Sequence, residues 1–163
     1  MESYLKVLKA MSEITGHKDM NQFAEAVALT PQQTADQMKF LANKGFVKKI
    51  GSGYAITDKG KAALKAIAPV ELGKEFQFYE TLGKPTGSSA STIVDFYEIV
   101  QNIVPESLEF HLYRGDFENW IGSAINDSAL ASDFSDARAK GLKGEELREA
   151  LCKALEAKHG FLI

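Results

Sequence analysis

The chain has 163 residues, of which 45% are hydrophobic and 25% charged, a composition typical of a globular protein with one domain or two small ones. No apolar run approaches the roughly 20 residues that a membrane-spanning helix needs, and the first residues lack the basic start and apolar block of a secretory signal, so we expect a cytoplasmic protein. The single cysteine, Cys152, excludes an internal disulfide and zinc sites built from several cysteines.

The formal net charge of −3 is unevenly distributed along the chain. Residues 1–68 contain ten lysines and six acidic residues, whereas residues 69–163 contain nine basic and sixteen acidic residues. Basic charge gathered in one region is typical of a domain that binds nucleic acid. The sequence therefore predicts that only the N-terminal region contacts phosphates.

The first region has the pattern of three consecutive helices. Residues 3–14 carry apolar side chains at helical spacing, and a second helix is expected within residues 19–27. Thr30 is a favourable N-cap and Pro31 suits the first helical turn, so a third helix is expected to begin there and to end at Gly45. Two helices joined by a turn of a few residues indicate a helix-turn-helix.

The third helix is predicted to have one buried face and one polar face. Thr34, Met38 and Leu41 recur at steps of four and three residues, which places them on the buried side. The opposite side is rich in glutamine, which can bond adenine bidentately in the major groove. Asp36 lies on that side too and is expected to weaken binding by repelling phosphate. The residues of this segment expected to contact DNA are Thr30, Gln32, Gln33, Gln37, Lys39 and Lys44.

After Gly45 the pattern changes to a β-hairpin. Residues 46–50 and 54–56 flank a glycine-bearing tip, as expected for two short antiparallel strands. Lys48 and Lys49 lie on the first strand and are expected to contact phosphates beside the groove. A further helix is expected to follow.

This order of elements resembles the winged-helix regulators of the MarR and ArsR type. The resemblance rests on Phe23-Ala24-Glu25-Ala26-Val27-Ala28-Leu29-Thr30, on Met38-Lys39-Phe40-Leu41 followed by Gly45-Phe46-Val47, and on the segment from Gly53 to Gly60. It implies a winged helix-turn-helix over residues 1–68 that binds double-stranded DNA. A homodimer is expected, because two copies can meet two half-sites one helical turn apart.

The rest of the chain is predicted to be a connector and a helical domain. Residues 69–88, with two prolines and several glycines, are expected to form a partly packed connector between the domains, and 76–79 to form a strand or lie against a domain surface. Residues 89–163 show helical periodicity throughout and predict an acidic all-α domain. The expected fold class is thus mainly α, with a small β-hairpin wing and a C-terminal all-α domain.

One motif in the second domain is similar to an uncharacterised helical domain of archaeal and bacterial proteins. The similarity is carried by His111, the pairs Asp116-Phe117 and Trp120-Ile121, and the later Asp127 with Leu130-Ala131. That domain has no known activity. The similarity therefore supports only a domain boundary near residue 88.

The candidate chemistry of the second domain lies at one turn. His111, Arg114 and Asp116 fall within six residues and could bind a phosphate or carboxylate ligand or transfer protons. Each also has a structural explanation, which we favour: Asp116 as an N-cap, Arg114 in an ion pair, and His111 on an apolar helix face. His17, His111 and His159 are too far apart in sequence to predict a metal site, and we expect no cofactor.

The predicted function is that of a DNA-binding transcriptional regulator. Its C-terminal domain is expected to dimerise, to sense a small molecule or to contact a protein effector. Two alternatives remain open: an adaptor whose winged helix binds protein, and an enzyme or ligand-binding protein with its site at His111, Arg114 and Asp116. We do not expect catalysis.

Overall fold

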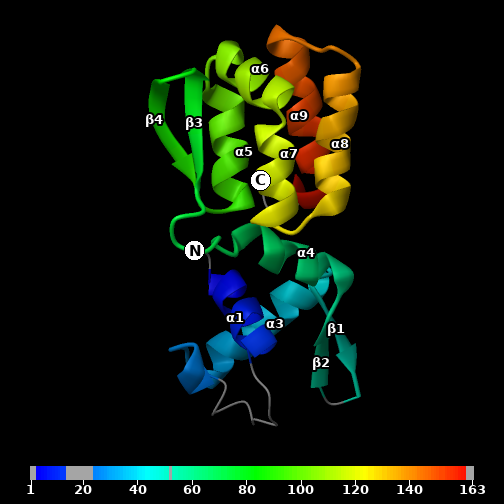
Figure 1. Ribbon diagram of the computed structural model, residues 1–163. Coiled ribbons are helices and arrows are strands. Elements are labelled where there is room, and N and C mark those ends of the chain that lie inside the picture. Colours follow the sequence, from blue (N-terminus) through cyan, green and yellow to red (C-terminus); the bar gives the residue numbers. More distant parts are fainter. Residues whose placement is uncertain (1–2, 14–23, 52, 161–163) are drawn as a thin grey trace. The chain divides into compact units, whose positions relative to one another are not determined.

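The computed structural model describes residues 3–13, 24–51 and 53–160 (Figure 1). The fold is mainly helical and contains β-hairpins, so this part of the predicted fold class is confirmed. Its internal contacts divide the chain into two compact units, Met1–Leu64 and Lys65–Ile163, hereafter unit 1 and unit 2. Among the described residues, no helix has the length and hydrophobicity required to cross a bilayer.

Unit 1 contains helices around a small hairpin. Its elements are α1 (Ser3–Glu13), α3 (Pro31–Asn43), β1 (Val47–Ile50), β2 (Gly53–Ile56) and α4 (Asp58–Ile67), whose last turn belongs to unit 2. Helix α1 packs against α3 and β2, and α3 also contacts β1. The buried side chains include Leu5, Val7, Leu8, Met38, Leu41, Phe46 and Val47. Of the helix expected within 19–27, residues 24–26 are helical, and 19–23 lie outside the described residues.

Local signals account for the elements of unit 1. The strands β1 and β2 pair antiparallel from Val47 opposite Ile56 to Ile50 opposite Gly53, as the glycine-bearing tip predicts. Thr57 precedes α4, and its hydroxyl Oγ1 accepts a hydrogen bond from the N–H of Gly60 at 3.1 Å. A capping residue bonds backbone groups only a few positions away from it. The start of such an element can therefore be predicted from the sequence.

Unit 2 combines a second hairpin with a group of helices. The strands β3 (Phe76–Thr81) and β4 (Lys84–Ala90) pair antiparallel, with β3 packed against α6 and β4 against α5. The helices are α5 (Ile93–Asn102), α6 (Pro105–Arg114), α7 (Asp116–Ser123), α8 (Ser128–Ala139) and α9 (Gly144–His159). Figure 1 shows the hairpin along one side of the helices and α8 and α9 on the other.

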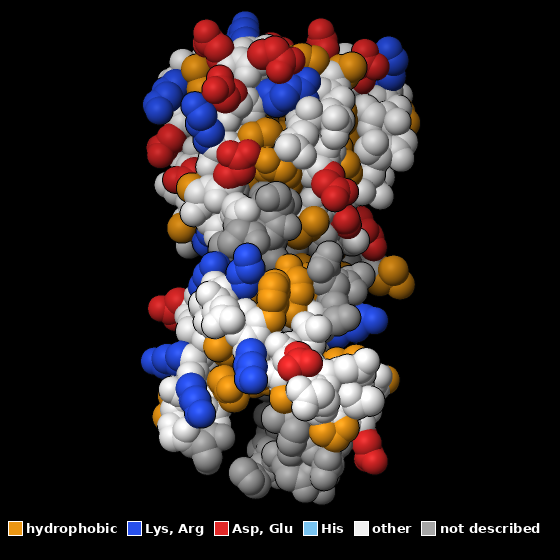
Figure 2. Space-filling model, turned by 180° about the vertical axis from the view of Figure 1, so that it is seen from behind, with side chains coloured by type: hydrophobic (Ala, Val, Ile, Leu, Met, Phe, Trp, Pro, Cys, Tyr) orange, Lys and Arg blue, Asp and Glu red, His pale blue; other side chains and the backbone are white. Residues whose placement is uncertain are grey.

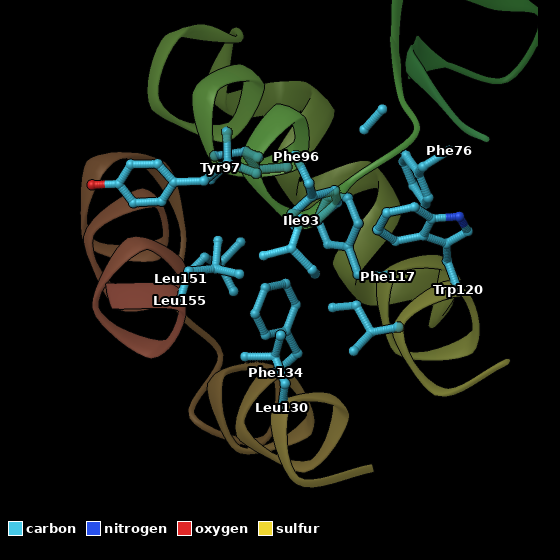
Figure 3. Packing of buried hydrophobic residues seen from close by; sticks show 14 of the residues in the cluster. Phe76, Ile93, Phe96, Tyr97, Phe117, Trp120, Leu130, Phe134, Leu151 and Leu155 are labelled. Carbon is cyan, nitrogen blue, oxygen red and sulfur yellow. The ribbon is translucent and has the colours of Figure 1, made fainter. Parts of the chain in front are cut away.

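Aromatic rings form the centre of the unit 2 core (Figure 3). The ring of Phe96 stacks on that of Trp120, with centroids 5.3 Å apart, and Phe117 meets Phe96 edge-on at the same centroid distance. Phe76 of the hairpin joins them, with its ring centroid 5.6 Å from that of Trp120. The indole N–H of Trp120 also donates to the carbonyl oxygen of Lys74 at 2.7 Å. The segment that enters the hairpin is thus attached to the core by a ring and by a hydrogen bond.

The expected connector is therefore largely part of unit 2. Residues 69–88 contain β3 and most of β4, and Phe76 and Phe78 are both buried in the core. The compact unit begins at Lys65 and includes the connector, which was expected to be partly packed, and β3 contains residues 76–79, for which a strand was one of two expectations. The reason is that the alternating apolar residues of β3 pack against helices that follow later in the chain.

Candidate functional sites

The polar face of α3 is the first candidate site. Thr30 and Gln33 form a capping box: the hydroxyl of Thr30 accepts from the N–H of Gln33 at 3.1 Å, and the side-chain oxygen of Gln33 accepts from the N–H of Thr30 at 3.0 Å. The predicted N-cap and first turn are thus confirmed. The box occupies the amide oxygen of Gln33, so its amide NH₂ is the group left to reach outward.

The remaining residues of this helix differ in their exposure. Gln32, Asp36 and Lys39 are exposed, whereas Gln37 is half-buried. The amide nitrogen of Gln32 donates to the Asp36 carboxylate at 3.0 Å, which joins the two side chains on the surface. Thr34, Met38 and Leu41 are buried, as their spacing predicts. The polar face is therefore centred on Gln32, Asp36 and Lys39.

The lysines of unit 1 lie at the end of α3 and on the hairpin. Lys44, the C-cap of α3, is exposed, and its ammonium lies 5.6 Å from the centroid of the Phe40 ring. Lys48 and Lys49 are exposed on β1, but consecutive residues of a strand point to opposite faces, so they cannot serve one surface together. In Figure 2, basic side chains are clustered on this hairpin, at lower left.

The second candidate site is the junction of α6 and α7. Helix α6 is capped at its C-terminus by Gly115, whose φ of 78° is the left-handed conformation that glycine adopts readily, and α7 begins at the next residue. Our expectation that Asp116 caps α7 is wrong, because Gly115 occupies the cap position and Asp116 is the first residue of the helix. The Asp116 carboxylate instead accepts hydrogen bonds from His111 Nδ1 at 2.9 Å and Arg114 Nε at 3.2 Å. The three predicted residues are thus joined through one carboxylate oxygen.

His111 is buried and both of its ring nitrogens are hydrogen-bonded. Nε2 accepts from the backbone N–H of Tyr79 at 2.8 Å, so the ring proton resides on Nδ1 and is donated to Asp116. Burial lowers the pKa of His111, although the bond to Asp116 opposes this effect, so the neutral ring is favoured. These contacts leave His111 no nitrogen with which to bind a ligand or exchange a proton.

Helix α6 also compensates for an irregularity in β3. The pairing of β3 with β4 shifts register between Gln77 and Tyr79, where Tyr79 comes to face Pro85. The carbonyl oxygen of Tyr79 accepts from the hydroxyl of the buried Ser107 at 2.7 Å, and its N–H donates to His111. One turn of α6 therefore satisfies both backbone groups of Tyr79.

A pocket of about 400 Å³ opens beside this junction. It is lined by Phe76, Gln77, Tyr79, Leu82 and Gly83 of the hairpin and by Phe110, His111, Arg114 and Asp116. The Arg114 guanidinium lies over the Phe110 ring, 4.8 Å from its centroid. The hairpin side of this pocket was not foreseen, because β4 is polar along most of its length and gives no alternating apolar pattern.

Neither a metal site nor a relative offers a further guide to function. Among the described residues, no group of three or more histidine, cysteine, aspartate or glutamate side chains is placed to hold a metal ion. No protein-family model, no curated protein and no solved structure matches this chain. The polar face of α3 and the junction of α6 and α7 are therefore the features that bear on function.

Proposed function

We propose that unit 1 binds double-stranded DNA, with α3 as the helix that enters the major groove and the β1–β2 hairpin beside it. The observation that carries the proposal is the solvent-exposed polar face of α3, which is continuous in sequence with a basic hairpin. Helix α3 has 13 residues, a length of about 20 Å, and the major groove admits a single helix of this kind.

The charge of this segment favours a phosphate-rich partner. Between Thr30 and Thr57 there are four lysines and one aspartate. All four lysines are exposed. Their ammonium groups can therefore contact phosphates and displace counterions from DNA without any rearrangement of the fold. Unit 2, which carries most of the acidic residues, is not proposed to contact the duplex.

Gln32 is the residue best placed to read bases. It is exposed in the first turn of α3, and its bond to Asp36 limits the directions in which its amide can point. A held amide loses less side-chain entropy when it bonds a base edge. Gln33 and Thr30 are proposed to contribute mainly by beginning the helix, and Lys39, Lys44 and Lys48 by contacting phosphates.

The test begins with selection of bound duplexes from a random pool by the full chain, followed by fluorescence anisotropy titrations at several salt concentrations. Gln32→Ala should weaken binding to the selected duplex by roughly 1 to 3 kcal/mol and change binding to a scrambled duplex little. Lys48→Ala should weaken binding to both and reduce the slope of log K against log salt by about one. Lys49→Ala should differ from Lys48→Ala, because the two side chains lie on opposite faces of β1.

Two further variants complete this test. Asp36→Asn keeps an oxygen that accepts from Gln32 and removes only the charge, so it should tighten binding most at low salt. Lys140→Ala removes an exposed lysine of unit 2 and should leave every titration unchanged. An equal effect of Lys140→Ala and Lys48→Ala would mean that binding reflects total charge and not the proposed surface.

Protein contact by unit 1 is the second candidate function. It is favoured by Ile50 at the end of β1, whose side chain is 57% exposed, and by Phe40 on α3, which is 39% exposed. Exposed apolar side chains of this size are typical of interfaces when they form a patch. If the full chain enriches no duplex and binds none at physiological salt, this candidate replaces DNA binding.

A further inference from the structure

We propose that the pocket between the β3–β4 hairpin and the end of α6 binds a small monocarboxylic acid with an apolar body. The carboxylate would accept hydrogen bonds from the guanidinium of Arg114, and the apolar body would lie against the hairpin. This site lies wholly within unit 2 and is independent of the proposed DNA binding.

The apolar part of the pocket comes from both sides. Phe76 and Tyr79 of β3 and Phe110 of α6 line the pocket, and so does Leu82 of the hairpin turn. The Leu82 side chain is 79% exposed, so a ligand that covers it removes apolar surface from water. A volume of about 400 Å³ is within the range of small-molecule sites and exceeds what a lone water or ion needs.

Arg114 is the polar group of the pocket that remains available. Its Nε donates to Asp116, and within the described part of the chain its two terminal nitrogens have no hydrogen-bond partner. Stacking over Phe110 and the bond to Asp116 together hold the plane of the guanidinium. A guanidinium held in this way presents two parallel N–H groups, the geometry that a carboxylate accepts bidentately.

The charges around Arg114 favour a single negative charge on the ligand. Of the residues that the structure describes, Arg114 is the one cationic side chain that lines the pocket, because His111 is held neutral by its contacts, and Asp116 lies 3.2 Å from Arg114. A doubly charged phosphate would be repelled by Asp116 without a second cation to balance it. His111 and Asp116 thus position Arg114 and the hairpin, and Arg114 alone binds the ligand.

The test uses the full chain and four probes: 3-phenylpropionate, hexanoate, the neutral 3-phenylpropanamide and phenyl phosphate. NMR spectra of the protein labelled at leucine methyl groups and arginine side-chain nitrogens report the site directly. The two carboxylates should shift the signals of Leu82 and Arg114 with a Kd of about 1 mM or tighter. The amide should bind at least about ten-fold more weakly, the factor that one lost charge-assisted pair accounts for. The phosphate should also bind more weakly than the carboxylates, because Asp116 repels its second charge.

Variants separate binding from folding. Arg114→Gln should lose the preference for the carboxylate over the amide, while the exposed cation variant Lys143→Gln should keep it. Leu82→Glu changes an exposed residue of the hairpin turn, so the chain should fold normally. It should lose binding, because the added carboxylate repels the ligand's carboxylate and the apolar contact of Leu82 is gone. The proposal is overturned if neither carboxylate shifts these signals, if carboxylate and amide bind equally, or if a folded Leu82→Glu variant binds as the parent does.

Discussion

Gly60→Ala tests the packing of unit 1. We expect this substitution to lower the stability of the unit, whereas replacing glycine by alanine within a helix usually raises stability. Gly60 is buried in the first turn of α4. A Cβ atom added there would lie 2.2 Å from the carbonyl oxygen of Phe46 and 2.7 Å from Cγ2 of Ile56. The Phe46 carbonyl is itself fixed, because it accepts from the N–H of Thr57 at 3.0 Å. The clash is with backbone, so a rotamer change cannot relieve it.

The magnitude follows from three contributions. Replacing glycine by alanine within a helix normally stabilises by about 1 kcal/mol. Forcing a methyl group into a packed site costs about 1 to 3 kcal/mol, and separating Phe46 from Thr57 loses a hydrogen bond of about 1 kcal/mol. Gly60→Ala should therefore destabilise unit 1 by about 1 to 3 kcal/mol.

The matched control is Gly122→Ala in α7. Gly122 is exposed, and an added Cβ would meet nothing within 4 Å, so this variant should stabilise unit 2 by about 1 kcal/mol. Amide hydrogen exchange followed by mass spectrometry localises both effects, since peptides of α4 and the β1–β2 hairpin should lose protection only in Gly60→Ala. If Gly60→Ala instead gains stability as the control does, α4 does not pack on Phe46 and our description of unit 1 is wrong.

Three further predictions concern backbone strain, the aromatic core and pH. Ala28 has a φ of 58°, so Ala28→Gly should stabilise unit 1 by about 1 kcal/mol and Gly45→Ala, at a φ of 83°, should destabilise it, as hydrogen exchange can show. Trp120→Ala should cost unit 2 roughly 3 to 5 kcal/mol, measured by urea unfolding followed by circular dichroism; a parental midpoint would place Trp120 outside the core. Because burial lowers the pKa of His111, the unfolded chain binds this proton more readily, so unit 2 should lose stability as the pH falls below about 6.5. His111→Gln should make that loss smaller, and an unchanged pH profile of the urea midpoint, followed by Trp120 fluorescence, would contradict this reasoning.

Elements whose signals are local can be predicted from the order of residues. Thr30 and Thr92 accept from the N–H three residues later and begin α3 and α5, and Pro105 begins α6. The apolar periodicity of α3 identified its three buried residues correctly. A cap or a helical stripe depends on side chains within one or two turns, so residue order alone contains the information.

The completion of unit 2 and the contacts of its turn residues depend instead on segments far apart in the chain. His111 bonds the backbone of Tyr79, 32 residues earlier, and the Arg148 guanidinium donates to the carbonyl oxygens of Val100 and Ile103 at 2.6 Å each. The proximity of His111, Arg114 and Asp116 was visible in the sequence, but the hairpin wall of their pocket was not. Such partners are chosen by packing between distant segments: a buried N–H or carbonyl must be satisfied by whichever group the fold brings to it, and spacing along the chain does not reveal which one that is.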